Sequence, residues 1–353
     1  MKLKTGELFT IFSILDSYTA LSKAFTSEYK EYVRLYSKGD GKLYFIANNC
    51  EDLKIIQTTT IDIDTKIDKL YTVSELSNIV KNVMNYVEVE LIDDIIYFED
   101  GKFTLFVIDS MNEDKKEELF NIQKYEVDKK FNVDSDLEEE LKDIFLLLNL
   151  KSQGASNSYF YKDGRLYFNF NELYIRKDSI LNFIITDIIS LRMISKILLK
   201  NKGSLVNYGT VNSKLVLDSN DFYIESSVFV EDENSVNYLT SYFDKIVDEK
   251  QIKMKLEFVN FVSAINTFDS ESTVTFKDDE VFISSKFRKN VANFKIENIE
   301  SEFIISTDIL YKVLSYIIKF KNVNSLDFKL ISINDNKFLE FNYGTIKIIT
   351  EVV

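Results

Sequence analysis

The chain lacks histidine, proline and tryptophan, and it has one cysteine, Cys50, and nine glycines among its 353 residues. Histidine is the side chain best suited to move protons near neutral pH. Its absence excludes Ser-His-Asp and Cys-His catalysis, and zinc sites that need histidine. One cysteine excludes a disulfide or a cysteine metal cluster within the chain. These absences predict a non-enzymatic protein without cofactors, in a reducing, cytoplasmic setting.

Long hydrophobic runs are also missing. The most apolar stretch, Asn182–Leu199, is interrupted by Asp187, Arg192 and Lys196, and no run approaches the roughly 20 apolar residues of a membrane span. The run Leu8–Leu15 follows two lysines, as in a signal peptide, but acidic residues bracket its short apolar core. An amphipathic helix is therefore the better interpretation, and we expect no membrane partner.

The composition is that of a folded protein with an acidic surface. Hydrophobic residues make up 45% of the chain and charged residues 28%, and the formal net charge is −14. The length predicts two or three domains, each with its own core. The abundance of Ile, Lys and Asn is typical of AT-rich coding, as in a phage or an AT-rich bacterium. The acidic balance argues against a chain that coats nucleic acid with its whole surface but allows a local basic face.

Two amphipathic helices and a set of short strands recur three times along the sequence. Equivalent points are Tyr71-Thr72, Ile185-Thr186 and Ile305-Ser306, each at the start of the second helix of its copy. Such internal repetition indicates architecture rather than function. It predicts three domains, at residues 1–115, 128–247 and 250–353.

Local patterns place several elements within the copies. A first helix is expected over Glu7–Lys23, and a second begins at Thr72, where Glu75 has the capping-box spacing. The turn Lys38–Lys42 contains two glycines and predicts a hairpin. The charged stretch Ser110–Lys130 has no strong periodicity and is interpreted in part as an interdomain linker. Further strands are expected near Tyr174–Arg176, at Phe103–Asp109 and along the last fifty residues.

The ordered set resembles the three-domain DNA sliding clamps, the β-subunit type of bacterial DNA polymerase III, including phage-encoded versions. The resemblance covers the whole length. It depends on the Met1-Lys2-Leu3 start, the three repeated units and the final apolar strand Ile346–Val353. It implies an α+β fold of three clamp domains, each with two helices packed on antiparallel sheets, that together form half of a ring. It also implies a homodimer that encircles double-stranded DNA topologically, without sequence specificity, and tethers the DNA polymerase.

Basic residues gather on the second helices and their exits, and others lie in segments that the resemblance brings near DNA. Such local basicity suits a lining that attracts phosphates weakly. The alternative is that lysines at helix ends only complement the helix dipole. The predicted DNA-facing residues are Lys23, Lys81, Lys151, Gln153, Arg192, Lys196, Lys200, Lys202, Lys312, Lys319 and Lys321.

The resemblance also implies an apolar pocket between the middle and last domains for short peptide motifs of the polymerase and the clamp loader. The predicted pocket residues are Leu173, Tyr174, Ile175, Arg176, Ile246, Val247, Ile349, Val352 and Val353. Plain strand packing is the alternative for these apolar residues. The chain also departs from the family pattern, with Asn171-Glu172 before Leu173 and Ile349-Thr350-Glu351 in the tail.

Acidic clusters such as Asp93-Asp94 and Glu138–Glu140 are interpreted as solvated turns and helix faces, and no metal site is expected. Asp62-Ile63-Asp64 with Asp68 lacks the glycine and the closing glutamate of a calcium loop. A phage structural or scaffolding protein built from the same modules is the alternative function. If the chain is phage-encoded, we expect it in the host cytoplasm.

Overall fold

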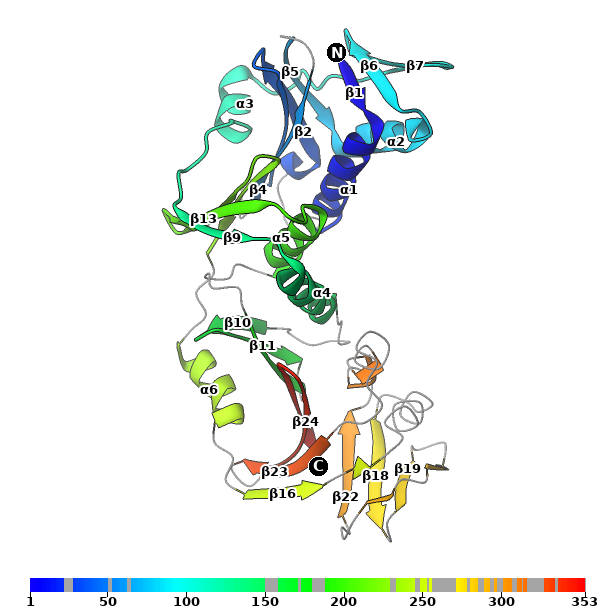
Figure 1. Cartoon of the computed structure of the whole chain (residues 1–353), viewed down its shortest axis with the longest axis vertical. Helices are drawn as coiled ribbons and strands as arrows, with labels where there is room; N and C mark the ends of the chain where they lie inside the picture. The colour runs from blue at the N-terminus through cyan, green and yellow to red at the C-terminus, as the bar shows by residue number, and fades with distance from the viewer. Residues whose placement is uncertain are drawn as a thin grey trace. The chain divides into compact units, whose positions relative to one another are not determined.

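The computed structural model has an α+β fold in which helices pack on antiparallel sheets (Figure 1). The chain divides into two compact units: unit 1 is Met1–Phe145 with Phe183–Phe229, and unit 2 is Leu146–Asn182 with Val230–Val353. The structure describes residues 1–21, 28–49, 53–61, 65–149, 158–170, 173–179, 188–228, 233–244, 248–252, 254–255, 271–277, 280–284, 289–292, 295–296, 301–306, 310–312, 314–315, 327–333 and 336–352.

The first two helices of the chain are α1 (Thr5–Leu21) and α2 (Val73–Val83), which pack against each other. Helix α2 begins where the sequence predicts, because the Thr72 hydroxyl accepts a hydrogen bond from the Glu75 backbone N–H at 3.4 Å. The Glu75 carboxylate accepts a bond from the Phe106 N–H at 3.0 Å, and so ties the helix to a distant segment.

Unit 1 contains two sheets. The smaller one has the order β1 (Lys2–Lys4), β6 (Glu88–Ile92), β7 (Ile95–Phe98) and β8 (Gly101–Thr104). The larger one has the order β5 (Lys66–Thr72), β2 (Tyr32–Lys38), β3 (Lys42–Asn48), β4 (Leu53–Thr60), β15 (Phe222–Ser227), β14 (Lys214–Asp218), β13 (Leu205–Val211) and β9 (Lys129–Asn132).

Unit 2 is organised around one branched sheet. Its first path has the order β10 (Ser158–Lys162), β11 (Arg165–Phe170), β12 (Leu173–Asp178), β25 (Ile346–Val352), β24 (Asn336–Tyr343), β23 (Asp327–Ile333) and β16 (Asp248–Ile252). From β25 a second path leads through β22 (Ser301–Ser306), β18 (Glu271–Lys277) and β19 (Glu280–Ser284) to β20 (Lys289–Ala292). Strands β17 (Met254–Lys255) and β21 (Lys295–Ile296) form a separate pair.

The remaining described helices are η2 (Glu28–Glu31), α3 (Glu113–Leu119), α4 (Ser135–Asn149), α5 (Ile188–Lys200) and α6 (Glu233–Asp244). Helix α3 lies inside the stretch predicted to be partly linker, and α6 was not predicted. Strand β8 ends at Thr104, so the predicted strand Phe103–Asp109 is too long. The segment between β8 and β9, residues 105–128, is called the connector below.

The predicted hairpin turns are confirmed by the backbone. Gly39 and Gly41 have positive φ angles of 85° and 74° between β2 and β3, a conformation that glycine adopts without steric cost. Asp93 and Asp94 also have positive φ, 47° and 63°. Asp94 is not simply solvated, however, because it pairs with Lys69 and accepts a hydrogen bond from the Tyr71 hydroxyl at 2.6 Å.

The strand pairing repeats three times. A short first strand pairs with a three-stranded meander in the series β1-β6-β7-β8, β9-β13-β14-β15 and β16-β23-β24-β25. In the second and third series, the last meander strand also pairs with a hairpin strand of the preceding copy: β15 pairs with β4, and β25 pairs with β12. The repeat predicted from the sequence is therefore visible in the topology.

The two junctions, β4–β15 and β12–β25, have the same register. The Thr58 N–H bonds to the Asp221 carbonyl in unit 1 as the Asp178 N–H bonds to the Thr345 carbonyl in unit 2, each at 2.9 Å. Apolar cross-strand pairs, Ile56 with Tyr223 and Tyr174 with Ile349, lie in the hydrophobic core of each unit. The connector contributes Phe120 to the core of unit 1, and α6 contributes Phe243 to the core of unit 2. Each junction is therefore a packed sheet rather than a loose hinge.

Candidate nucleic-acid interface and partner pocket

Helices α1, α2 and α5 of unit 1 carry several of the residues predicted to face DNA. Helix α1 contacts both α2 and α5, and Figure 1 shows α1 and α5 close together. Helix α2 buries Val73, Leu76, Ile79, Val80 and Val83, which leaves the opposite side of this amphipathic helix for polar residues.

Lys81 lies in the last turn of α2 and is half exposed. Its ammonium group pairs with Asp16 of α1 at 2.7 Å, and Asp16 also accepts a hydrogen bond from the Ser77 hydroxyl at 2.5 Å. The charge of Lys81 is therefore already balanced by a neighbouring helix.

Lys196 of α5 binds to α1 instead of projecting into solvent. It donates hydrogen bonds to the Ser13 carbonyl at 2.7 Å and to the Ser17 hydroxyl. Burial lowers the pKa of Lys196, and the positive charge of Lys200 lowers it further. Burial likewise lowers the pKa of Arg192 on the same helix. Both cations are partly removed from solvent, and Lys196 serves the helix packing.

Lys200 and Lys202 are exposed at the end of α5. Lys202 pairs with Glu138 of α4 at 2.6 Å, and Glu138 also pairs with Lys142 at 2.5 Å. The hydrogen bonds from Lys142 and Lys202 lower the pKa of Glu138. Lys200 is the predicted DNA-facing residue of α5 that is most available to a phosphate.

Lys312 is the one predicted DNA-facing residue of unit 2 within the described part of the chain, and it is exposed on a helical segment. The others lie outside the described residues: Lys23, Lys151, Gln153, Lys319 and Lys321. Among these described cations, Lys81, Lys196 and Lys202 have protein partners, so their charge is already partly balanced within the chain.

Among the described residues of the predicted partner pocket, four are buried in core packing. Leu173, Tyr174, Ile175 and Ile349 are each no more than 5% exposed. Tyr174 and Ile349 pack with Phe243 of α6. Val352 of β25 lies opposite Lys337 of β24, whereas Ile246, Val247 and Val353 lie outside the described residues.

Arg176 is the polar side chain that the structure brings to this junction. It is half-buried, and its guanidinium lies 5.4 Å from the centroid of the Phe243 ring, within cation–π range. Nearby, Lys347 pairs with the buried Glu340 at 2.9 Å. Sequence reasoning missed Phe243 because α6 was missed, although the spacing of Val236, Thr240 and Phe243 is helical.

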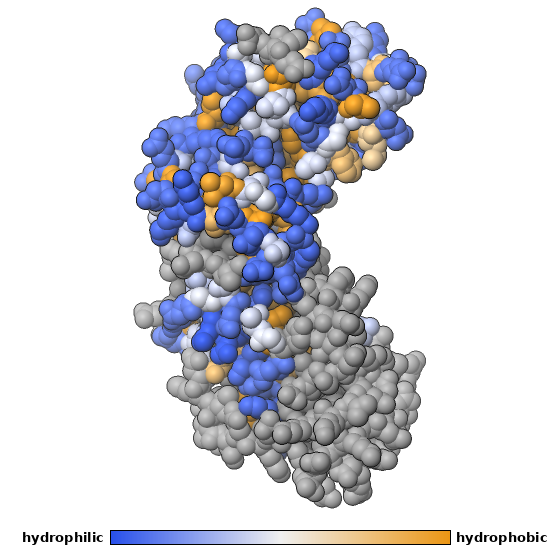
Figure 2. All heavy atoms as spheres, viewed as in Figure 1, coloured by the Kyte–Doolittle hydropathy of each residue, from blue (hydrophilic) through white to orange (hydrophobic). Residues whose placement is uncertain are grey.

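The described residues contain no cluster of three metal-ligating side chains and no helix long and apolar enough to cross a membrane. Their surface is largely hydrophilic in the view of Figure 2, with scattered hydrophobic spots.

The fold is that of known structures. The chain matches the DNA polymerase III subunit beta of Pseudomonas aeruginosa with a TM-score of 0.73 and 9% identity, over 100% of this chain and 99% of that one. It matches the beta subunit of Thermotoga maritima with a TM-score of 0.73, 14% identity and coverage of 100% and 98%. It also matches the DNA polymerase sliding clamp of Bacillus subtilis with a TM-score of 0.69 and 14% identity, over 100% of this chain and 98% of that one.

No protein-family model matches the chain, and no curated protein sequence matches it. The structural likeness nevertheless extends over the full length of the chain and nearly the full length of each matched structure. The chain has the fold of the bacterial sliding clamps, the β subunits of DNA polymerase III.

Proposed function

We propose that the chain is a non-enzymatic processivity factor: a sliding clamp that encircles duplex DNA as a homodimeric ring and tethers a replicative polymerase. The full-length likeness to solved sliding clamps supports this function. The observation that carries the ring, however, comes from the strand pairing of this chain.

Strands β8 and β20 are edge strands whose counterparts in the other copies pair with each other. In the described residues, β8 pairs only with β7, and β20 pairs only with β19. Strand β8 is the last meander strand of the first copy, equivalent to β15 and β25. Strand β20 is the last hairpin strand of the third copy, equivalent to β4 and β12. The chain thus contains two complete junctions, β4–β15 and β12–β25. Strands β8 and β20 are each one half of a further junction of the same kind.

An open edge strand can pair with a strand of another chain, because its backbone N–H and C=O groups on that side have no strand partner. A second copy of the chain offers the missing strand for each edge, and we infer head-to-tail pairing of β8 with the partner's third copy. Phe106, which follows β8, is 76% exposed, as expected of an apolar side chain that a partner covers.

The charge distribution fits a ring through which DNA slides. The net charge of −14 disfavours tight binding over the whole surface. Lys81 and Lys202 are balanced by Asp16 and Glu138, so few phosphate contacts hold the duplex at one position. Retention on DNA then depends on the closed ring and needs no base recognition.

Polymerase and clamp-loader peptides would dock at the β12–β25 junction. The packed apolar side chains there leave Arg176, half-buried above the core, as the described group best placed to meet a peptide. No enzymatic step is required of the chain, and replication of this kind would take place in the cytoplasm, that of the host if the chain is phage-encoded.

The test is retention on nicked circular DNA in the presence of a clamp loader and ATP. A topologically bound ring stays on the circle during gel filtration at high salt and is released when the DNA is cut once. Sedimentation should give about twice the chain mass of 41.2 kDa. A monomer, or equal retention on circular and linear DNA, would refute the proposal.

A further inference from the structure

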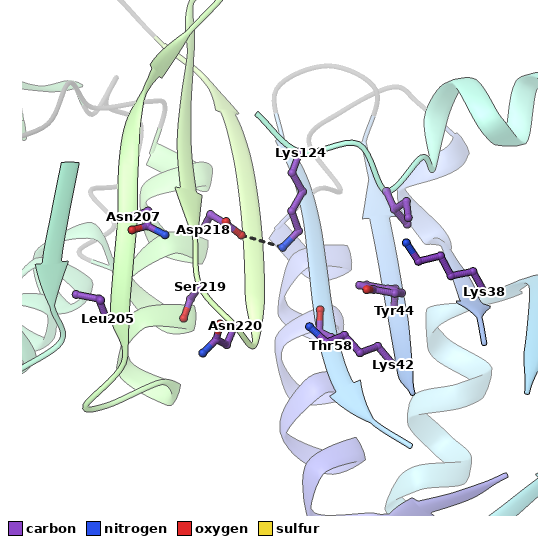
Figure 3. Close-up of a pocket in the computed structure, with 11 residues that line it drawn as sticks. Lys38, Lys42, Tyr44, Thr58, Lys124, Leu205, Asn207, Asp218, Ser219 and Asn220 are labelled. Atoms are coloured by element: carbon purple, nitrogen blue, oxygen red, sulfur yellow. Dashed lines mark hydrogen bonds and ion pairs between the residues drawn. The ribbon is translucent and has the colours of Figure 1, made fainter. Parts of the chain in front are cut away.

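A polar cavity of about 510 Å³ lies on the larger sheet of unit 1, at the β4–β15 junction. Figure 3 shows side chains of β3 and β4 on one side, among them Lys42 and Thr58, and Asn207 and Asp218 of the neighbouring meander on the other. Lys124 of the connector closes it between them. A cavity of this size falls in the range that holds small ligands or peptide side chains.

Three lysines line the cavity, in a chain with a large excess of acidic residues. Lys124 pairs with Asp218 at 2.8 Å, and Lys38 makes a longer contact of 3.8 Å with Asp40. Lys42 is exposed, and the structure records no ion pair for it among the described residues. With Asp218 and Asp40 set against Lys38, Lys42 and Lys124, one positive charge, that of Lys42, is left in excess at the cavity.

The two junctions differ at the position of Thr58. The Thr58 N–H donates to the Asp221 carbonyl in unit 1, and the Asp178 N–H donates to the Thr345 carbonyl in unit 2, each at 2.9 Å, so Thr58 corresponds to Asp178. Asp178 is a carboxylate that pairs with Arg165 at 3.3 Å, whereas Thr58 is uncharged and lines the cavity beside Lys42. The junction in unit 1 therefore has no carboxylate at the position where unit 2 has one.

We propose that this cavity, termed the basic junction pocket, binds an acidic peptide segment of a partner protein. The ammonium groups of Lys42 and Lys38 would pair with the carboxylates of the peptide. Lys124 would also contact a peptide carboxylate while it keeps its ion pair with Asp218. Ile122 and the half-exposed Leu205 supply apolar contact for an adjacent aliphatic side chain. Charge-assisted hydrogen bonds of this kind are the stronger class.

A neighbouring cavity favours a peptide over nucleic acid. It is also about 510 Å³, shares Lys42 and Thr58 with the first, and is lined by Glu7 and Asp221. A nucleic-acid strand carries a negative charge at every phosphate and would be repelled where it crossed these carboxylates. A peptide can place acidic residues over the lysines and polar or basic residues beyond them.

The pocket does not depend on the proposed clamp function, because it involves neither the helices nor the β8 and β20 edges. It is tested with the purified full chain and a fluorescein-labelled hexapeptide of alternating aspartate and leucine. The comparison ligands are the same peptide with asparagine in place of aspartate, and a labelled thymidine oligonucleotide of equal charge. Fluorescence anisotropy measures binding.

We expect the aspartate peptide to bind more tightly than either comparison ligand, and Lys42→Glu to weaken its binding at least about tenfold. Lys337→Glu is the matched control, since Lys337 is an exposed strand lysine of unit 2. Thr58→Arg is the decisive variant: it adds positive charge but places a bulky side chain in the cavity that Thr58 lines.

In a shaped pocket, Thr58→Arg abolishes binding, whereas nonspecific attraction to a basic surface becomes stronger in this variant. Circular dichroism confirms that each variant is folded. The proposal is overturned by tighter binding to Thr58→Arg, by equal losses in Lys42→Glu and Lys337→Glu, or by no binding to the wild-type chain. Tighter binding of the oligonucleotide overturns the peptide assignment in favour of nucleic acid.

Discussion

Replacing Arg34 with methionine should loosen the connector from unit 1. Arg34 lies on β2 with only 1% of its surface exposed. It donates to both carboxylate oxygens of Asp68, at 2.7 and 2.8 Å, to the Phe120 carbonyl at 3.0 Å, and to Glu117. One guanidinium thus joins the sheet to helix α3 and to the residue that ends it.

The expected cost is about 3 kcal/mol of unfolding free energy. The buried Phe120 carbonyl would lose its Arg34 donor, which costs about 1–3 kcal/mol. Asp68 and Glu117 are 37% and 58% exposed, so water can rehydrate them and each adds at most about 1 kcal/mol. Asp68 also keeps a contact with Lys116 at 3.3 Å. Arg34→Lys retains a charge but not the planar fork, and about half the loss is expected.

Urea unfolding followed by far-UV circular dichroism measures the loss, and hydrogen exchange of residues 113–125 locates it. Although burial by itself raises the pKa of Asp68, the hydrogen bonds and charge of Arg34 hold it below its ordinary value. A lowered carboxylate pKa contributes stability that is present above the unfolded pKa of about 4 and is lost as pH falls through the folded value. The difference between wild type and Arg34→Met should therefore shrink below about pH 4. An unchanged urea midpoint together with unchanged connector exchange would show that Arg34 does not hold the connector.

Three further sets of variants test separate parts of the structure. Phe106→Glu alters an exposed residue beside β8, so it should leave thermal unfolding nearly unchanged but raise the dimer dissociation constant at least about tenfold; an unchanged sedimentation profile would argue against this edge. Lys196→Met should lower stability by about 1 kcal/mol without changing the salt dependence of DNA binding, whereas Lys200→Met should reduce that salt dependence; the reverse pattern would assign Lys196 to DNA. Gly209→Ala places a Cβ 2.8 Å from Val127 of the connector and should cost about 1–3 kcal/mol, which Val127→Ala should largely restore; no rescue would show that the crowding lies elsewhere.

Local sequence patterns predicted the elements whose causes are local. Thr72 caps α2 because its hydroxyl reaches an N–H three residues ahead, and Gly39 and Gly41 turn the first hairpin because they accept positive φ. Helix α3 was not predicted from its charged stretch, because its apolar contacts come from Leu119 and Phe120, which pack into the core with residues of the larger sheet, and periodicity does not report such long-range contacts.

The roles of individual cations could not be predicted, because they depend on which distant residues approach them. Arg34 and Lys54 look like ordinary strand residues in the sequence, yet both are buried, and Lys54 donates to Asn121 at 3.0 Å and to the Gln123 carbonyl at 3.1 Å. Lys196 is a good candidate for DNA until α1 is placed beside α5. The sequence reports charge, whereas burial and pairing follow from long-range packing.

The repeated junction also bears on whether a head-to-tail assembly closes. A contact between unlike surfaces generates a ring if its rotation closes and an open filament if it does not. Within the chain, the β4–β15 and β12–β25 junctions use the same register, which favours a similar rotation from one copy to the next. If β20 and the partner's β8 pair in that register too, every junction in the assembly repeats one rotation. A ring and a helical filament both repeat one rotation, so concentration-dependent sedimentation must decide between them: a ring stops at the dimer, whereas a filament grows as the protein concentration rises.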